Sequence, residues 1–234
     1  GSGGIIVKIA HNGIILPITD LDGNESEYYY FEDTWDEFVM DIVETTNGDI
    51  FTAGFKTGSG MSDDSFWIYK FVGIQDNSTL DFETSKLINY SLNDDRAFAI
   101  CESLSDNGVV IAGYSNNQNM LVLHLDNNLQ TINSLNLGNG ILYDIQQTAD
   151  QGYIVAGKHN SSNGSDNVYI AKLSSGLNLE WEQSFGGNLN EGAFSVVSLS
   201  DGYAIAGYTF SFVDSIKNSD MFFLKVDFSG NRVF

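Results

Sequence analysis

Short runs of apolar residues, bounded by Gly, Asn, Asp or Ser, recur along the chain. Runs that are rich in β-branched and aromatic residues and end in turn formers predict β-strands. Two short sequence motifs, here called phrases, repeat among them. One ends in Ala-Gly, with its Ala at positions 53, 112, 156 and 206, and the other carries a basic residue near its end, at Lys8, Lys70, His124, Lys172 and Lys225. The pattern predicts an all-β fold built from an internal repeat.

The Ala-Gly pairs lie 59, 44 and 50 residues apart, which is the length of a four-stranded propeller blade. Each repeat divides into strands A to D, where the Ala-Gly phrase is strand B and strand A is expected at 38–45, 97–104, 141–148 and 193–199. Asn-Gly, Gln-Gly and Asp-Gly pairs between strands A and B suit tight hairpins. We therefore predict a β-propeller of four-stranded antiparallel blades, with strand D, clearest at Leu179–Phe185, on the outer edge.

The number of phrases predicts four complete blades plus an N-terminal half-blade, because five basic phrases accompany only four Ala-Gly phrases. The chain would begin in the middle of a blade and end in a strand D. The expected units are a half-blade at 1–19, an inserted acidic and aromatic loop at 20–37, and blades at 38–92, 93–138, 139–187 and 188–234. Further propeller blades or subunits of the same assembly are therefore expected as partners.

The last repeat contains the segments Phe185-Gly-Gly187, Ala193-Phe-Ser-Val-Val197, Asp201-Gly-Tyr-Ala-Ile-Ala-Gly-Tyr-Thr209 and Asp220-Met-Phe-Phe-Leu-Lys-Val-Asp227. In these segments the chain resembles the SBBP-type bacterial β-propeller repeat family, and the resemblance extends over most of the chain from Phe38 onward. It implies a propeller of an exported bacterial protein, secreted or at the cell surface, and it implies no single activity. The stretch 19–35 and the missing Gly-Gly of the other repeats depart from the family pattern.

Acidic residues dominate the charge, since 31 Asp and Glu against 10 Lys and Arg give a formal net charge of −21 over 234 residues. Such a chain repels phosphate backbones and anionic lipids, which excludes nucleic-acid and membrane-surface binding. No apolar run is long enough for a transmembrane helix. The single cysteine, Cys101, rules out an internal disulfide framework and is expected to be buried and inert. Proteins, neutral glycans and metal ions remain as partners.

Basic residues stand out in so acidic a chain. Four of the ten cations, together with His124, occupy the same place in strand C. We expect their stems to pack along the sheet and their charges to pair with carboxylates of neighbouring strands or loops. The three histidines lie in separate segments, so none has the pair spacing of a zinc site.

Two acidic residues occupy equivalent positions of the predicted A strands, which line the tunnel of a propeller. The aligned strands place Asp41, Ala99, Asp144 and Ser195 at this position. Glycosidases use such carboxylates in pairs, one to protonate the leaving oxygen and one to attack or to activate water. Alternatively, each carboxylate binds water or backbone donors. Because only two of four repeats carry the acid, we expect no enzyme, and catalysis by Asp41 and Asp144 is the less favoured hypothesis.

The inserted segment is both acidic and aromatic. Alternating oxygen side chains resemble the start of a calcium loop, in which Ca²⁺ takes about six to eight oxygen ligands; they are Asp20, Asp22, Asn24 and Glu27. The loop is either a weak calcium site or a solvated acidic surface. The aromatic residues that follow either cover the edge of the half-blade or form a stacking surface for a sugar or a partner chain.

Propeller connections alternate between two faces of the molecule. The A-to-B turns are tight, whereas the B-to-C loops 57–65, 158–167 and 209–220 are long, polar and different in each repeat. Long variable loops on a rigid scaffold are the usual place of binding. We therefore predict a non-catalytic exported module that binds a protein or glycan on the face of the B-to-C and D-to-A loops; a rigid structural spacer is the alternative. The expected binding residues are Tyr28, Tyr29, Tyr30, Trp35, Phe210 and Phe212.

Overall fold

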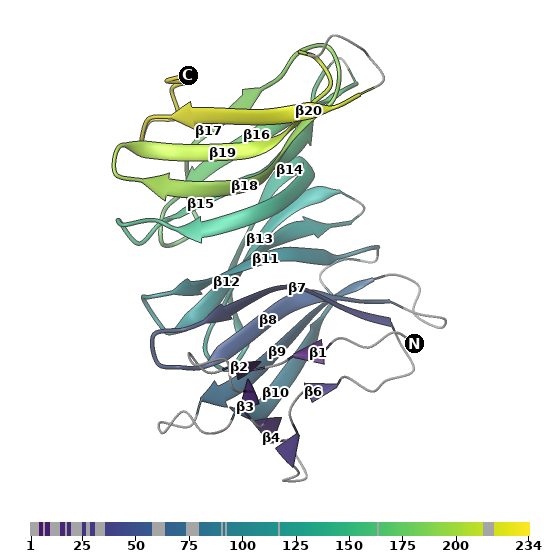
Figure 1. Ribbon diagram of the computed structural model, residues 1–234, viewed down its shortest axis with the longest axis vertical. Coiled ribbons are helices and arrows are strands. Elements are labelled where there is room, and N and C mark those ends of the chain that lie inside the picture. Colours follow the sequence, from purple (N-terminus) through teal and green to yellow (C-terminus); the bar gives the residue numbers. More distant parts are fainter. Residues whose placement is uncertain are drawn as a thin grey trace.

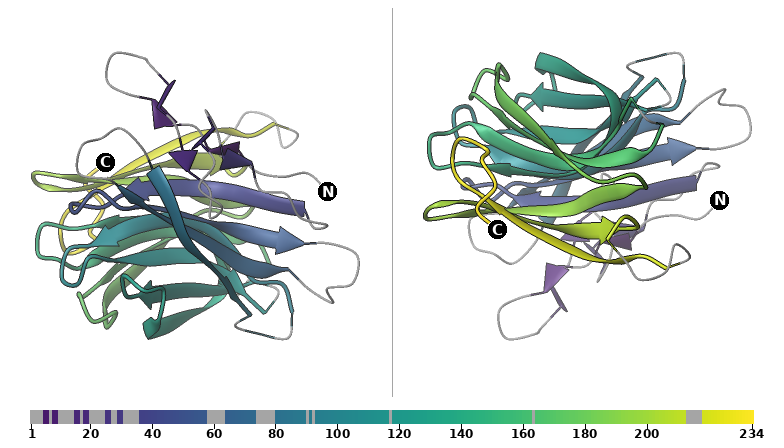
Figure 2. Two further views of the ribbon diagram at one scale, coloured as in Figure 1. Left: turned by 90° about the horizontal axis from the view of Figure 1, so that it is seen from below. Right: turned by 90° about the horizontal axis from the view of Figure 1, so that it is seen from above.

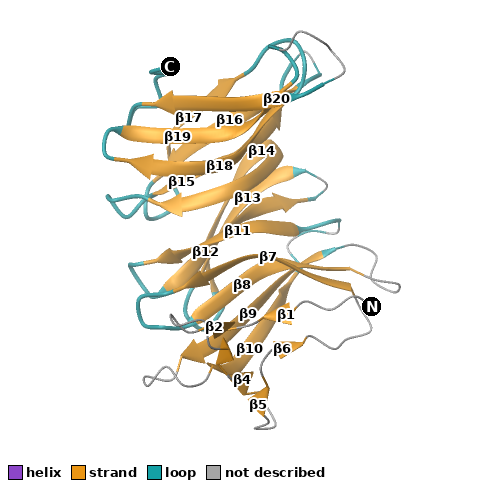
Figure 3. Ribbon diagram, in the orientation of Figure 1, coloured by secondary structure: helices purple, strands orange, loops and turns teal. Residues whose placement is uncertain are grey.

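The computed structural model describes the strand segments 5–6, 8–9, 15–16, 18–19, 25–26 and 29–30, and then residues 36–57, 64–73, 80–89, 91, 93–116, 118–162, 164–212 and 218–234. These residues form strands and turns, with no helix among them (Figure 3). The all-β prediction is confirmed. Consistent with the absence of a predicted span, no helix in the described part of the chain is suited to cross a membrane.

Antiparallel meanders of consecutive strands form the body of the molecule (Figure 1). The first sheet consists of β7 (Asp36–Glu44), β8 (Ile50–Thr57), β9 (Ser65–Gly73) and β10 (Leu80–Ile88). The second consists of β11 (Arg96–Ser103), β12 (Gly108–Ser115), β13 (Asn119–Leu125) and the first part of β14 (Thr131–Gln147). The third consists of the rest of β14, β15 (Tyr153–Asn160), β16 (Asp166–Leu173) and β17 (Leu179–Phe185). Strand β17 has the bounds expected of the clearest strand D.

Strand β14 belongs to both the second and the third sheet. Its residues up to Asn139 pair with β13, and its residues from Gly140 pair with β15. The change of partner coincides with positive φ angles of 88° at Gly138 and 152° at Gly140, which glycine adopts without a steric penalty. Two predicted blades are thus joined within one long strand instead of through a loop.

The fourth sheet consists of β18 (Glu191–Leu199), β19 (Gly202–Thr209) and β20 (Asp220–Val226). Beyond β20, Arg232 forms a single bridge to Val226. The N–H of Lys225 donates to the carbonyl of Phe234 (3.1 Å), and the N–H of Val233 donates to the carbonyl of Lys225 (2.8 Å). Among the described residues, only these contacts stand in the place of the strand D that we expect for the last blade. The number of complete blades therefore stays a prediction.

The N-terminal segments are short: β1 (Ile5–Ile6), β2 (Lys8–Ile9), β3 (Ile15–Leu16), β4 (Ile18–Thr19), β5 (Glu25–Ser26) and β6 (Tyr29–Tyr30). β2 and β3 form an antiparallel pair, as a half-blade requires. β4, however, pairs in parallel with β10 and antiparallel with β5, so it extends the outer edge of the first sheet. An outer strand has N–H and C=O groups without a ladder partner, and a further strand satisfies them. The half-blade as a separate unit therefore also stays a prediction.

Apolar side chains fill the spaces between consecutive sheets. Among the described residues they form one core between each successive pair of the four sheets. Phe51 and Ile68 of the first sheet, for example, pack with Ile111 and Leu123 of the second. Every residue of β12 is buried, because its sheet is covered on both faces. This double burial explains why the B and C strands are continuous apolar runs without polar alternation.

The sheets stand side by side along the long axis of the molecule (Figure 1). Their first strands, β7, β11, β14 and β18, contact one another in chain order and form the inner edge. In the described part of the chain the sheets do not close into a ring (Figure 2). The A-to-B turns lie at the left end of the strands in Figure 1, and the B-to-C connections lie at the right end.

Candidate functional site

Each inner strand carries a β-bulge at the same position of the repeat. The pairing between strands A and B shifts register there, across Met40, Phe98, Tyr143 and Phe194. A bulge leaves one residue unpaired and re-aims its side chain. The bulged residue directly precedes the tunnel position that Asp41 and Asp144 occupy. Every sheet thus presents one large apolar side chain at its inner edge.

The Ala-Gly phrase of strand B fits this bulge. Its alanine pairs with the residue after the bulge, as Ala156 does with Asp144. A Cβ atom on the following glycine, Gly157, would overlap the carbonyl oxygen of Ile141. The glycines at 54, 113 and 207 face a strand-A carbonyl in the same way. The phrase that repeats in the sequence is therefore a steric requirement, because only glycine permits so close an approach of two backbones.

Aromatic rings follow one another along the inner edge, near the end that carries the B-to-C and D-to-A connections. The bulged residues Phe98, Tyr143 and Phe194 have ring centroids 5.3 and 5.4 Å apart. Tyr208 of β19 lies 5.2 Å from Phe194, and Phe210 lies 5.9 Å from Tyr208. We call these five residues the aromatic row. Such spacings are those of interacting rings, and Phe194 is 56% exposed, so the row offers ring surface to solvent.

The two tyrosines of the row keep their protons at neutral pH. Burial raises the pKa of Tyr143 and of Tyr208, and nearby Lys158 lowers both by less. Lys158 is itself paired with Asp166 at 2.6 Å. A neutral phenol both donates and accepts hydrogen bonds. The row therefore combines apolar ring faces with polar tips, which suits a sugar or a polypeptide better than an ion.

Asp41, the first carboxylate of the catalytic hypothesis, bridges two sheets. One Oδ atom accepts a hydrogen bond from the N–H of Ile42 (2.8 Å), and the other accepts one from the N–H of Ile100 on β11 (2.9 Å). Burial raises the pKa of Asp41, the two N–H groups lower it in part, and the negative charge of Asp144 raises it further.

Asp144 repeats this arrangement two sheets further along, between the third and fourth sheets. Its Oδ1 accepts the N–H of Ile145 (2.8 Å), and its Oδ2 accepts the N–H of Val196 on β18 (2.7 Å) and the hydroxyl of Ser195 (3.0 Å). Both aspartates therefore hold the next sheet through its backbone. This geometry favours the alternative reading, in which each carboxylate binds backbone donors, over a catalytic pair.

The structure describes only some of the expected binding residues. Phe210 joins the aromatic row, and Phe212 is 68% exposed beyond the end of β19. Tyr29 and Tyr30 form β6, whose backbone pairs with β1. Tyr28, Trp35 and the side chains of the other two tyrosines lie outside the described residues. The row therefore contains one of the six residues expected from the sequence.

The calcium hypothesis lies outside the described residues as well, since Asp20, Asp22, Asn24 and Glu27 are not among them. Their flanks are described: Thr19 of β4 pairs with Glu25 of β5, so the segment between them connects two antiparallel strands. Within the part of the chain that the structure describes, no group of three or more His, Cys, Asp or Glu side chains could hold a metal ion. Cys101 is buried, as expected, and burial raises its pKa.

The strand-C cations pair with carboxylates of the A-to-B turns, which confirms the expectation for the four described members. The pairs are Lys70–Asp49 at 3.5 Å, His124–Asp106 at 3.1 Å, Lys172–Asp150 at 2.9 Å and Lys225–Asp201 at 2.7 Å. Partial burial would raise the pKa of Asp150. Hydrogen bonds from Thr148, Lys172 and the N–H of Gly152 outweigh burial and lower this pKa to about 2. These pairs lie at the end of the strands opposite the aromatic row and have a structural role.

Four residues of the row were missed by the sequence reasoning: Tyr208 of strand B and the bulged residues Phe98, Tyr143 and Phe194. Alignment of the A strands places the three bulged residues one position before the Asp41 position, so a column of large, mostly apolar residues was visible there. In a regular strand successive side chains point to opposite faces, so the residues of this column would point away from the side chains at the Asp41 position. Only the bulge shows that these side chains form a continuous row at the inner edge.

Comparison with known proteins yields structural neighbours alone. No family model and no curated protein matches the chain. It is similar to hydrazine synthase of Kuenenia stuttgartiensis, with a TM-score of 0.53, 11% identity, and coverage of 83% of this chain and 64% of that chain. It is also similar to a subtype N10 neuraminidase-like protein of A/little yellow-shouldered bat/Guatemala/060/2010, with a TM-score of 0.51, 10% identity, and coverage of 86% of this chain and 59% of that chain.

A second neuraminidase-like protein, from A/bat/Guatemala/164/2009, has a TM-score of 0.51 and 10% identity, and the match covers 98% of this chain and 59% of that one. These neuraminidase-like neighbours are propellers. The fold is propeller-like. The chain spans less than two thirds of the length of these structures, and at this identity the likeness concerns the fold alone.

Proposed function

We propose that the protein is a non-catalytic, propeller-type binding module of an exported bacterial protein. The observation that carries the proposal is the aromatic row, in which five rings extend over three sheets on the face of the B-to-C and D-to-A connections. Rings fixed on a rigid sheet lose little entropy when a ligand stacks on them. The ligand class is a glycan or an extended protein segment, and the neutral polar tips of the row favour a glycan.

The bonding of Asp41 and Asp144 supports a role without catalysis. A catalytic carboxylate must present an oxygen to the substrate or to its water. Here both oxygens of each aspartate accept backbone N–H groups, and loss of these bonds would leave the N–H groups of the buried residues Ile100 and Val196 unpaired. A propeller-like fold hosts many functions, glycosidases among them, so turnover of a glycan panel by the unmodified protein would contradict the proposal.

The test is a binding screen on a glycan array, supplemented by unfolded polypeptide as a protein probe. Phe194→Ala and Tyr143→Ala should lose binding. Phe228→Ala is the matched control, because Phe228 is similarly exposed but lies in the turn after β20, at the opposite end of the strands. Equal binding by the Phe194 and Phe228 variants would contradict the assignment of the site.

An exposed apolar face favours a second candidate, a spacer or module within a larger propeller assembly. Met221 and Phe223 of β20 are 96% and 60% exposed. Their counterparts in the other sheets are fully or almost fully buried beneath the next sheet; they are Phe66, Met120, Val168, Ile68, Val122 and Ile170. We infer that further blades, in the same chain or in another subunit, cover this end face. Analytical ultracentrifugation tests it: the wild type should associate with rising concentration, Phe223→Lys should not, and Phe212→Lys should behave as wild type.

A further inference from the structure

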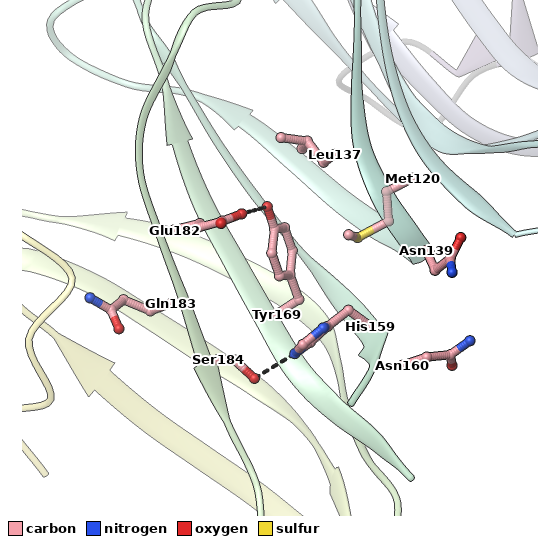
Figure 4. Close-up of a pocket in the computed structure, with 9 residues that line it drawn as sticks. All are labelled: Met120, Leu137, Asn139, His159, Asn160, Tyr169, Glu182, Gln183 and Ser184. Atoms are coloured by element: carbon pink, nitrogen blue, oxygen red, sulfur yellow. Dashed lines mark hydrogen bonds between the residues drawn. The ribbon is translucent and has the colours of Figure 1, made fainter. Parts of the chain in front are cut away.

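A cavity of about 490 Å³ opens between the second and third sheets (Figure 4). Its apolar wall is formed by Met120, Leu137 and the ring of Tyr169, of which Met120 and Tyr169 are almost fully buried. Its polar wall includes His159, Glu182 and Ser184. These residues lie toward the starts of C strands and the ends of B and D strands. The cavity therefore opens on the same face as the aromatic row, farther from the inner edge.

The third sheet lacks the acidic side chain that begins strand A elsewhere. The other three sheets have a buried acid there, at Glu37, Asp95 and Glu191, and the third sheet has Gly140 at the equivalent position. A Cβ atom on Gly140 would overlap the carbonyl oxygen of Lys158 and would lie 2.8 Å from Cα of His159 and 3.0 Å from Sδ of Met120, so no side chain fits. The wall of the cavity that Met120 and His159 form therefore carries no carboxylate from strand A.

His159 lacks the carboxylate that its counterparts bind. Lys56, in the same place of the first sheet, pairs with Glu37 at 3.2 Å, and Thr209 of the fourth sheet donates to Glu191 at 3.0 Å. His159 instead shares a 2.6 Å hydrogen bond with the hydroxyl of Ser184 across the cavity. Its ring lies 5.6 Å from that of Tyr169. The imidazole ring of His159 and the phenol ring of Tyr169 are therefore held beside the cavity by the neighbouring strands β15 and β16.

Tyr169 and Glu182 form the second polar pair of the cavity (Figure 4). The Tyr169 hydroxyl donates to Oε2 of Glu182 at 2.6 Å. Burial raises the pKa of Tyr169, and the bond to Glu182 raises it further, so the hydroxyl remains a donor. This bond fixes the orientation of the carboxylate of Glu182, an exposed residue of β17 that lines the cavity. The amides of Asn139 and Asn160 stand across from it.

These groups select a neutral ligand with several hydroxyl groups. A bound anion would lie beside the carboxylate of Glu182. In addition, a backbone N–H that binds the buried acid in the fourth sheet has a different acceptor in the third sheet. Ser211 donates its N–H to Glu191, whereas its counterpart Ser161 donates to the carbonyl of Ser165 at 2.8 Å. A hydroxyl both donates to a carboxylate and accepts from an amide or imidazole. The C–H face of a sugar ring suits the flat rings, and the volume lies within the range of about 300–1,000 Å³ for small-molecule sites.

We propose that this cavity binds a neutral mono- or disaccharide, held by Glu182, Asn139 and His159. The ligand class rests on the proposed function, but the site is separate from the aromatic row. The probes are the methyl glycosides of glucose, galactose and N-acetylglucosamine, together with maltose and lactose. Binding is measured by saturation-transfer NMR and calorimetry, and thermal unfolding verifies that each variant is folded.

At least one probe should bind the wild-type chain, and Glu182→Gln should weaken binding about tenfold or more, as expected for a lost hydrogen bond to a charged group. Glu180→Gln is the matched control. It makes the same change on the same strand, but Glu180 pairs with Lys172 at 3.3 Å, outside the cavity. This variant should bind as the wild type does. Phe194→Ala should also retain binding here, even where it abolishes binding at the aromatic row.

Four outcomes would overturn the proposal. The first is that none of the probes binds. The second is an equal loss in the Glu182 and Glu180 variants, which would show a general effect of charge. The third is binding of butylammonium that depends on Glu182 in the absence of saccharide binding, which would make the cavity a cation site. The fourth is loss of saccharide binding through Phe194→Ala alone, which would support the aromatic row and contradict the cavity.

Discussion

The carboxylate of Asp144 on β14 accepts the backbone N–H of Val196 on β18 at 2.7 Å. Asp41 on β7 makes the same bond to Ile100 on β11. In each case a side chain of one sheet satisfies a backbone donor of the next, two residues beyond the bulge. The aspartates thus add polar bonds between sheets whose shared cores are apolar, and this relationship makes their role measurable.

Asp144→Ala should lower the free energy of unfolding by about 2 kcal/mol, because it leaves the N–H of Val196 without its partner. Ser195→Ala removes only one of the three bonds to Asp144 and should cost about 1 kcal/mol or less. Urea unfolding followed by circular dichroism gives both values. Equal stability of the Asp144 variant and the wild type would refute the structural role.

Gly157→Ala should destabilise the protein by more than about 3 kcal/mol or prevent folding, because the new methyl group would overlap the carbonyl oxygen of Ile141. Gly164→Ala is the control. Gly164 has a φ of +83° and no atom within 4 Å of an added Cβ, so only the backbone strain of about 1 kcal/mol remains. A similar cost at both positions would contradict the bulge as the reason for the Ala-Gly phrase.

Met221→Lys should leave the stability of the isolated chain nearly unchanged, since the side chain is 96% exposed. Val168→Lys places the same charge at the equivalent position of the third sheet, which is fully buried, and should abolish folding. Melting temperatures of the two variants make the comparison. If Met221→Lys is as damaging as Val168→Lys, the end face is covered within the chain itself.

The pair formed by Lys172 and Asp150 should make stability depend on pH at the acid end. The folded-state pKa of Asp150 is lowered to about 2, below its value of about 3.9 in the unfolded chain. Its contribution is therefore present above about pH 4 and is lost as pH falls toward 2. Asp150 is 59% exposed, so screening leaves less than about 1 kcal/mol. Asp150→Asn should flatten the dependence in this window, and an unchanged acid profile would contradict it.

Calcium should raise the melting temperature if Asp20, Asp22, Asn24 and Glu27 bind it, because a ligand of the folded state alone stabilises that state by mass action. The hypothesis rests on the concentration of negative charge in this segment, which a cation would neutralise. Millimolar calcium and chelator are compared in low-salt buffer, and Asp22→Ala should remove the shift. Indifference to calcium would leave a solvated acidic loop.

The strands, their order and the face of the connections follow from the sequence because they depend on local properties. Apolar runs, turn residues and the glycine opposite each bulge are set within a few tens of residues. The strands β7, β11, β17 and β18 lie within a few residues of their expected bounds, whereas β14 begins ten residues before the expected strand A and joins two sheets. The pairing of strand-C cations with turn carboxylates could be anticipated as well, since the hairpins that join these strands bring the two groups to the same end of the sheet.

Only the tertiary structure decided what lies between the sheets and at their inner edge. The bond from Asp144 to Val196, the row from Phe98 to Phe210 and the cavity beside Gly140 all join residues of different repeats. Local patterns fix which face of a strand is apolar, but they do not fix how neighbouring sheets are packed. Likewise, β4 pairs with β10 because an outer edge strand accepts whichever segment the packed chain brings to it. These relationships depend on distances between segments remote in sequence, and such distances exist only once the sheets have packed.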